Sequence, residues 1–355
     1  MRSDVVRTRA VAPLHGVAIG PALVVGAAVL VVMMLVSACA GAVTVPLADT
    51  WHVVLTHVTG ATAGLDPALD QIVWQYRMPR VLLAACCGIG LSVAGVVLQA
   101  VVNNPLADPY VLGLSSGASL GAVAVIVGVG GAVGGLGTSS AAFLGAMLAV
   151  GLVLLLGQQR GRLAPTRVVL AGVAVGYLLL AATNYLQLQA NPNQLREVMF
   201  WTLGSVAGAT WDQLALVIAV VLGSTGGLLL FGRRLNVLSA GDEQATALGV
   251  DVRTLRLGLL AVASLLTGVL IANAGGIGFV GLMIPHLVRL TFGVDHRRVL
   301  PMSALVGGAY LVAVDLLSRT VDAPNELPLG IFTAAFGAPF FLWLLRRNQS
   351  IGGST

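Results

Sequence analysis

Lysine is absent from the sequence: all 19 basic residues among the 355 are arginines. A phosphate-binding P-loop holds the nucleotide phosphates with a lysine amine, so this chain cannot hydrolyse ATP in the usual way. Any step driven by ATP therefore needs a partner ATPase, which would bind the ATP and Mg²⁺ itself. We expect the chain not to be an enzyme and to have no catalytic residue, cofactor or metal site of its own.

Charged residues are scarce as well, at 9% of the chain, whereas 57% of the residues are hydrophobic and the mean hydropathy is +0.94. No soluble domain hides that much apolar surface, so the composition indicates an all-α polytopic membrane protein. The three cysteines, Cys39, Cys86 and Cys87, lie in apolar runs. They are too few for a disulfide framework, and we interpret them as small buried hydrophobic residues.

Long apolar runs fill the rest of the chain and predict ten membrane-spanning helices, in a single transmembrane domain over residues 1–355. The first run exceeds 20 residues, which is the length of a span and not of a secretory signal, so we expect it to be retained. The expected spans are Val17–Ala40, Val81–Val102, Val111–Gly128, Ala141–Gln158, Val168–Gln189, Trp211–Gly232, Leu255–Ala274, Ile277–Phe292, Leu300–Thr320 and Leu329–Leu345.

The arginines set the expected orientation of these spans. With the N-terminus in the cytoplasm, 15 arginines fall inside and only Arg77, Arg80, Arg196 and Arg319 fall outside. This bias follows the positive-inside rule and places both termini in the cytoplasm. The outer segments are then a loop over residues 41–80 and a short amphipathic helix over residues 194–203, which we expect to lie along the membrane surface.

A polar island over residues 233–256 separates the sixth and seventh expected spans on the cytoplasmic side. Within it, Asp242–Leu248 is predicted to form a short helix with Ser239 as its N-cap and acidic residues in its first turn. Gly249 fits the C′ position that ends such a helix. We expect this helix to be a handle that another protein grips, and we assign the flanking arginines to topology.

Two motifs within the spans allow a catalytic or a structural interpretation. Gly113-Leu-Ser-Ser-Gly117 matches the nucleophile elbow, which needs a strand–turn–helix context with histidine and acidic partners. Here the motif opens a membrane helix, so we favour helix packing over catalysis by Ser115 or Ser116. Asp315 would suit a proton relay, but Arg319 follows four residues later, and we favour an ion pair on one helix face.

Other polar residues stand close to the ends of the spans. Arg77 and Arg80 either snorkel to the interface or bind an acidic partner. Asn104 belongs either to a plain cytoplasmic turn or to the lining of a pathway. His286 has no second ligand at a useful spacing for a metal, so we expect it to have a structural role facing the cytoplasm.

Several sequence blocks together resemble the FecCD-type permease subunits of iron-siderophore, haem and cobalamin ABC importers, the type II importer family. The resemblance covers nearly the whole chain in order, and no single block carries it. The blocks are Arg77-Met-Pro-Arg80, Gly95–Gln99, Asn104–Gly113 with Ser116–Ala118, Gly241–Gly249, Gly278–His286 with Arg289, Leu327–Gly330 and Gly337–Phe341.

The resemblance implies a ten-helix permease of the bacterial inner membrane that dimerises around a central pathway, and we expect a homodimer. A short coupling helix would rest on a cytoplasmic ATPase pair, and a periplasmic or lipid-anchored binding protein would deliver the cargo outside. By position, the family's functional residues are Ala240, Gly241, Asp242, Glu243, Ala245, Leu248 and Gly249 for ATPase coupling; Arg77, Arg80 and Arg319 for binding-protein docking; Asn104, Leu106 and Thr166 for the cytoplasmic gate; and Pro105, Pro109, Pro285, His286 and Arg289 for structure.

The cargo expected from family frequency is a ferric siderophore first, haem second and cobalamin third. The alternative function is an ion- or proton-coupled secondary transporter, which requires paired intramembrane charges and symmetric broken helices. The expected spans offer essentially Asp315 alone for that purpose. A neighbouring gene for a P-loop ATPase and another for a secreted binding protein would favour the importer.

Overall fold

The computed structural model describes residues 19–41, 43–60, 66–129, 132–133, 136–159, 162–163 and 165–352. Over this part of the chain the protein is almost wholly helical. Two short antiparallel ladders join consecutive helices: Ala132–Val133 (β1) with Leu136–Gly137 (β2), and Gln158–Gln159 (β3) with Arg162–Leu163 (β4). The helices are α1 (Ile19–Cys39), α2 (Leu47–Thr59), α3 (Pro67–Asp70), the π-helix η1 (Gln71–Arg77), α4 (Met78–Val102), the 3-10 helix η2 (Pro109–Leu112), α5 (Leu114–Val129), α6 (Thr138–Gly157), α7 (Pro165–Gln187), α8 (Pro192–Leu203), α9 (Trp211–Leu230), α10 (Gly232–Ser239), α11 (Asp242–Ala247), α12 (Val252–Ala274), α13 (Val280–Phe292), α14 (His296–Ser318) and α15 (Leu329–Gly352).

Each of the ten expected spans has a helix at its place among the described residues. Seven helical segments are long and apolar enough to cross a membrane, and three shorter apolar helices stand at the third, eighth and tenth expected spans. A crossing by these three stays a prediction. The helix expected over residues 194–203 is confirmed as α8, which begins with a capping box between Asn191 and Gln194.

The orientation of the spans also stays a prediction. Arg2, Arg7, Arg9 and Arg160, which contribute to the arginine count, lie outside the described residues, as does Val17 at the start of the first expected span.

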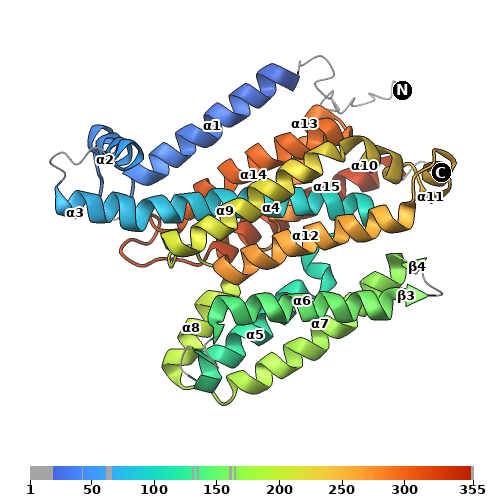
Figure 1. Ribbon diagram of the computed structural model, residues 1–355, viewed down its shortest axis with the longest axis horizontal. Coiled ribbons are helices and arrows are strands. Elements are labelled where there is room, and N and C mark those ends of the chain that lie inside the picture. Colours follow the sequence, from blue (N-terminus) through green and yellow to red (C-terminus); the bar gives the residue numbers. More distant parts are fainter. Residues whose placement is uncertain are drawn as a thin grey trace, which may run out of the picture.

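Helix α4 forms the centre of the molecule and is buried along nearly its whole length (Figure 1). Two glycines let neighbouring backbones approach it closely. A side chain on Gly88 would collide with the backbone of Gly307 in α14, and one on Gly95 would collide with Gly281 in α13. Helices α4, α13 and α14 therefore pack backbone against backbone, as small residues allow in membrane proteins.

Helices α5, α6 and α7 form a second group beside this centre, in the lower half of Figure 1. Gly117 and Gly145 face each other, and a side chain on either would collide with the backbone of the other helix. The packing interpretation of the Gly113–Gly117 motif is therefore confirmed. The cysteines are free, with Cys86 and Cys87 buried and Cys39 half-buried, which confirms that no disulfide joins them.

The second span begins earlier than the sequence predicted. The helical segment runs without interruption for 36 residues from Pro67 to Val102. The prediction of a loop over residues 41–80 is therefore wrong for the second half of that range, which is helical. The first half of the range contains α2. Arg77 and Arg80, which were expected to snorkel to the interface or to bind an acidic partner, are both buried inside the protein and have hydrogen-bond partners far along the chain. These hydrogen-bond partners offset the free-energy cost of burying the two guanidinium charges.

The polar segments of the chain lie at two opposite ends of the molecule (Figure 1). Helices α2 and α3 and the start of the helical segment leading into α4 lie at one end. Helices α10 and α11 lie at the opposite end. The chain therefore offers two candidate sites, joined by the long helices between them.

Candidate functional site

We call the polar turn between α9 and α12 the coupling segment, after the role that the resemblance implies for it, and that role stays a prediction. It is formed by α10, Gly241, α11 and Gly249. Gly241 has φ +117° and Gly249 has φ +79°, so both bends use backbone conformations that favour glycine. Gly249 ends α11 as predicted. The predicted N-cap is wrong, because α10 continues through Ser239, and Gly241 takes the N-cap position with no side-chain bond.

Helix α11 presents most of its surface outward. Ala245 is fully buried and seats the helix, whereas Ala240, Glu243 and Leu248 are exposed, with Leu248 at 70%. A largely exposed leucine at the tip of a polar turn is available for contact with another protein. The arrangement fits a short helix docked into a partner's groove.

Asp242 and Arg256 join α11 to α12. The Arg256 guanidinium is buried and donates two parallel bonds to Asp242, at 3.0 and 2.9 Å. Such a bidentate pair fixes orientation as well as distance. The assignment of the flanking arginines to topology stays a prediction. Arg256 in addition holds α11 against α12, a contact that the sequence did not reveal.

Asn236 joins α10 to α14 across 60 residues of sequence. Its Nδ2 donates to Asp295 Oδ1 at 2.7 Å, and its Oδ1 accepts the backbone N–H of His296 at 2.8 Å. The His296 ring Nδ1 also lies 2.8 Å from the Asn236 Oδ1. Hydrogen bonds from Arg297 hold the pKa of Asp295 well below its usual range. Sequence reasoning missed all of these partners.

A third polar contact links α4 to α13 at the same end of the molecule. Arg289 donates to Gln99 Oε1 at 2.6 Å, and Gln99 Nε2 donates to the Gly281 carbonyl at 3.0 Å. His286, one turn earlier, stacks edge-on against Phe340 of α15. The structural role expected for Pro285, His286 and Arg289 stays a prediction. A cavity of about 550 Å³ separates these residues from α10, lined among others by Asn104, Asn236 and Arg289.

The expected gate residues lie on the surface, and one of them, Asn104, lines this cavity. Asn104 is exposed, and its side chain accepts the backbone N–H of Leu106, which is itself 50% exposed. Thr166 is exposed in the first turn of α7. In a single copy of the chain these residues border open space, and their role as a gate stays a prediction.

Asp108 shapes the connection between α4 and α5. Its carboxylate accepts the backbone N–H of Tyr110 at 2.8 Å and caps η2, where Pro109 takes the first position. The Tyr110 hydroxyl accepts the backbone N–H of Ile277 at 2.7 Å. Burial raises the pKa of Asp108 to about 6, against the opposing effect of the Tyr110 bond.

We expect Asp108→Asn to stabilise the protein above about pH 6. A carboxyl whose pKa is raised on folding loses stability as the pH rises from the ordinary value of 3.8 to about 6, and the loss persists at higher pH. Asparagine keeps an acceptor for the cap and avoids this cost, which is at most about 3 kcal/mol. The Tm of purified variant should exceed that of wild type at pH 8, and the two should converge near pH 4. A variant Tm at or below wild type at pH 8 would contradict this account.

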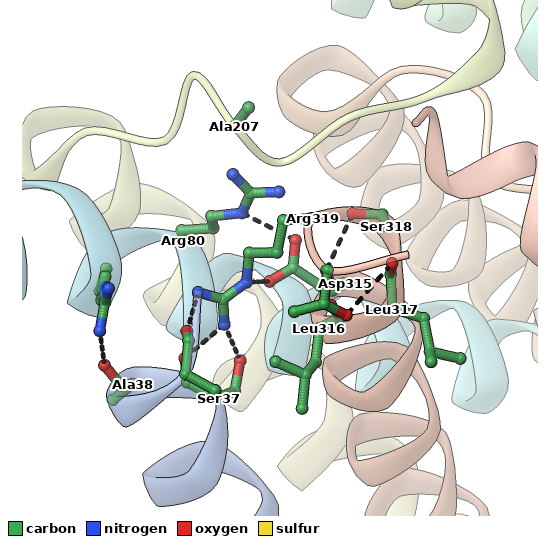
Figure 2. A network of polar contacts seen from close by, with 12 residues as sticks. Ser37, Ala38, Arg80, Ala207, Asp315, Leu316, Leu317, Ser318 and Arg319 are labelled. Carbon is green, nitrogen blue, oxygen red and sulfur yellow. Dashed lines mark hydrogen bonds and ion pairs between the residues drawn. The ribbon is translucent and has the colours of Figure 1, made fainter. Parts of the chain in front are cut away.

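The outer arginine cluster, Arg77, Arg80 and Arg319 with Asp315, lies at the other end of the molecule. Asp315 is fully buried, and its two oxygens lie 2.8 Å from Arg80 Nε and 3.4 Å from Arg319 Nε. Figure 2 shows Asp315 between the two guanidinium groups. The predicted pair of Asp315 with Arg319 is confirmed, and Arg80 joins it as a partner that sequence spacing did not reveal.

Two of these arginines also cap the end of α1. Arg77 donates to the carbonyls of Ala38, at 2.9 Å, and Cys39, at 2.8 Å, and Arg319 donates to the carbonyl and the hydroxyl of Ser37 (Figure 2). The last carbonyls of a helix have no partners within it, and a cation there also interacts favourably with the helix dipole. Arg77 and Arg319 are each only 7% exposed, so their guanidinium groups are engaged inside the protein.

Arg80 is the cluster member with a link to the surface. Its Nη1 donates at 2.7 Å to Glu326, whose side chain is 42% exposed. The expected docking of an acidic partner on Arg77, Arg80 and Arg319 stays a prediction. All three arginines are buried, and Arg80 differs from the others in having an exposed carboxylate, that of Glu326, as a partner.

A model of the FecCD transport family matches residues 29–347. The cobalamin import system permease BtuC of Halobacterium salinarum is 45% identical over 287 residues, which cover 81% of this chain and 76% of that protein. The hemin transport system permease HmuU of Yersinia pestis is 38% identical, and the alignment covers 90% of this chain and 93% of that protein.

A solved structure of a metal-chelate type ABC transporter, in an inward-facing conformation, aligns with a TM-score of 0.79 at 31% identity. The alignment covers 92% of this chain and 99% of that one. The matches run through both the coupling segment and the outer arginine cluster. The chain therefore belongs to the FecCD transport family.

Proposed function

We propose that this chain is the membrane permease subunit of an ABC importer that moves a metal chelate, haem or cobalamin into the cytoplasm. The observation that carries the proposal is α11, a short helix that exposes Glu243 and Leu248 outward while Ala245 and the Asp242–Arg256 pair fix it to the membrane helices. Because the chain lacks the lysine of a P-loop, the nucleotide site belongs to a separate ATPase pair.

A second copy of the chain is proposed to pack against α7. Tyr177 and Asn184 are exposed on this helix, seven residues apart and hence on one face, and Tyr177 is 71% exposed at the middle of a candidate span. A phenol and an amide facing lipid would lose their hydrogen-bond partners. A polar pathway between two copies satisfies them, and a hollow of about 640 Å³ beside Asn184 and Tyr185 would contribute to it.

Docking of the binding protein is proposed to centre on Arg80. Arg77 and Arg319 are engaged by the end of α1, whereas the Arg80 partner Glu326 is exposed on the loop that follows α14. A carboxylate of the binding protein would exchange with Glu326 at the Arg80 guanidinium. The other two arginines would then act by holding α1, α4 and α14 together beneath the docking surface.

Cobalamin is the cargo we now place first, ahead of haem and ferric siderophores. Relatives whose names carry a cargo include a cobalamin permease at 45% identity and a hemin permease at 38%. This order reverses the one expected from family frequency. Among the described residues, no group of three or more His, Cys, Asp or Glu could hold a metal ion.

The cargo is tested by purifying the binding protein encoded beside this chain and measuring its affinity for cyanocobalamin, haemin and a panel of ferric siderophores. We expect cyanocobalamin to bind at least about 100-fold more tightly than the others, a difference of about 2.7 kcal/mol. Preference for a ferric siderophore would restore the order of cargoes expected from family frequency. Preference for a compound outside these three classes would overturn the proposed cargo.

A further inference from the structure

Helix α14 connects the coupling segment to the outer arginine cluster in one piece. It begins at His296, beside Asn236 of α10, and ends at Ser318, three residues after Asp315. Its 23 residues span about 34 Å at 1.5 Å per residue. Along its length, Gly307 packs directly against Ser92 and Gly88 of α4. Pro301 stands in the second turn of α14 and removes one backbone hydrogen bond there, whereas the closely packed part around Gly307 shifts as a unit.

The bonds of Asn236 are not needed to form α14 itself. Asp295 already caps this helix, because its carboxylate accepts the backbone N–H of Arg297 at 3.0 Å. Asn236 adds three polar contacts to Asp295 and His296, all between α10 and the first turn of α14. Gly232 at the other end of α10 also lies against Arg297, with space for no larger residue without a shift. What Asn236 fixes is therefore the position of α10 on α14.

The coupling segment has two such attachments to the membrane helices. The Asp242–Arg256 pair ties α11 to α12, and Asn236 ties α10 to α14. The second leads into α14, whose other end carries Asp315 in contact with Arg80 and Arg319. Helix α10 also packs against α4, which carries Arg80 in its first turn, so α4 is a second route to the same cluster. Figure 2 shows that end of α14 in contact with Ser37 at the end of α1.

We propose that Asn236 is a positioning residue that carries movement of the coupling segment into α14, and along α14 to the outer arginine cluster. The inference rests on the proposed function, since it assumes that an ATPase pair moves α11. It specifies how the state of the ATPase reaches the surface that receives the binding protein. Loss of Asn236 should leave the movement of α11 intact and weaken the movement at the other end.

The test measures distances between spin labels in the reconstituted permease–ATPase dimer, without nucleotide and after trapping with ATP and vanadate. In one sample the label is placed at Gln244 on α11 of each copy in the dimer. In a separate sample it is placed at Val321, which is 61% exposed and whose backbone N–H donates to Leu317 at the end of α14. The background carries Cys39→Ser, because Cys86 and Cys87 are buried. In the wild type we expect both distances to change by about 2–5 Å on trapping.

In Asn236→Ala, the change at Gln244 should persist and the change at Val321 should fall by at least half. Asn236→Asp should give the same result, because the new carboxylate would repel that of Asp295. Combining Asn236→Asp with Asp295→Asn restores a donor–acceptor pair, and asparagine still caps α14, so the change at Val321 should return. Val237→Ala, on the same helix without these bonds, serves as the matched control.

Two results would overturn the inference. One is a full change at Val321 in Asn236→Ala. The other is equal loss of both changes together with a lower Tm, which would make Asn236 merely a stabilising residue. If neither distance changes in the wild type, the proposed function itself fails and the inference falls with it, so the two failures are told apart by the wild-type sample.

Discussion

Asp242→Ala is expected to reduce ATP-driven uptake at least tenfold while the permease still assembles with its ATPase. The substitution removes both bonds of the buried Arg256 guanidinium, whose Nε has no partner among the described residues. Breaking a charge pair of this kind costs about 1–3 kcal/mol where one partner is partly exposed, as Asp242 is here. Helix α11 then loses its fixed position on α12, and its movement is no longer transmitted. The measurement is cargo uptake per ATP hydrolysed in proteoliposomes.

The matched control is Asp212→Ala, which removes an exposed acid from the first turn of α9. It should leave uptake per ATP unchanged. Arg256→Lys should resemble Asp242→Ala, because a lysine amine cannot form the bidentate pair. Normal uptake by Asp242→Ala would remove α11 from the mechanism.

Asp315→Ala is expected to destabilise the protein by about 3–5 kcal/mol, the cost of leaving buried charges without their partner. Asp315 is fully buried, and its loss would leave Arg80 and Arg319 facing each other. The amount of folded protein in the membrane and the Tm in detergent should both fall. The matched control is Glu326→Ala at the exposed side of Arg80, for which a change within about 1 kcal/mol is expected.

The same experiment separates this account from a proton-coupled transporter. If Asp315 were a proton relay, Asp315→Asn would give folded protein with transport that no longer responds to a proton gradient. In our account Asp315→Asn is less stable than wild type, and whatever transport remains still requires ATP. Full stability of Asp315→Asn with loss of all transport would favour the relay.

The helices were predictable from the sequence because their signals are local. Apolar runs of about 20 residues set the positions of the spans, and Gly249 ended α11 where predicted. The Asp315–Arg319 pair was also predictable, since four residues on a helix bring two side chains to one face. Signals within a single stretch of about 20 residues therefore set the positions of most helices.

The contacts that position the sites could not be predicted, because their partners lie far apart in sequence. Arg80 and Asp315 are 235 residues apart, and Gln99 and Arg289 are 190 apart. The sequence indicated that Arg77 and Arg80 snorkel to the interface or bind an acidic partner, and only the fold reveals their contacts with α1 and α14. The Ser239 cap failed for a related reason: the burial of Leu235 and Leu238 makes α10 a helix that extends through Ser239.

The most direct test of the importer assignment is uptake into proteoliposomes that hold the permease with its ATPase and the loaded binding protein. Radiolabelled cyanocobalamin, haemin and a ferric siderophore are supplied separately, with ATP or with an imposed proton gradient. We predict accumulation of one of these compounds that requires ATP, requires the binding protein and is unaffected by collapse of the gradient. Accumulation driven by the proton gradient in vesicles without the ATPase would contradict the account.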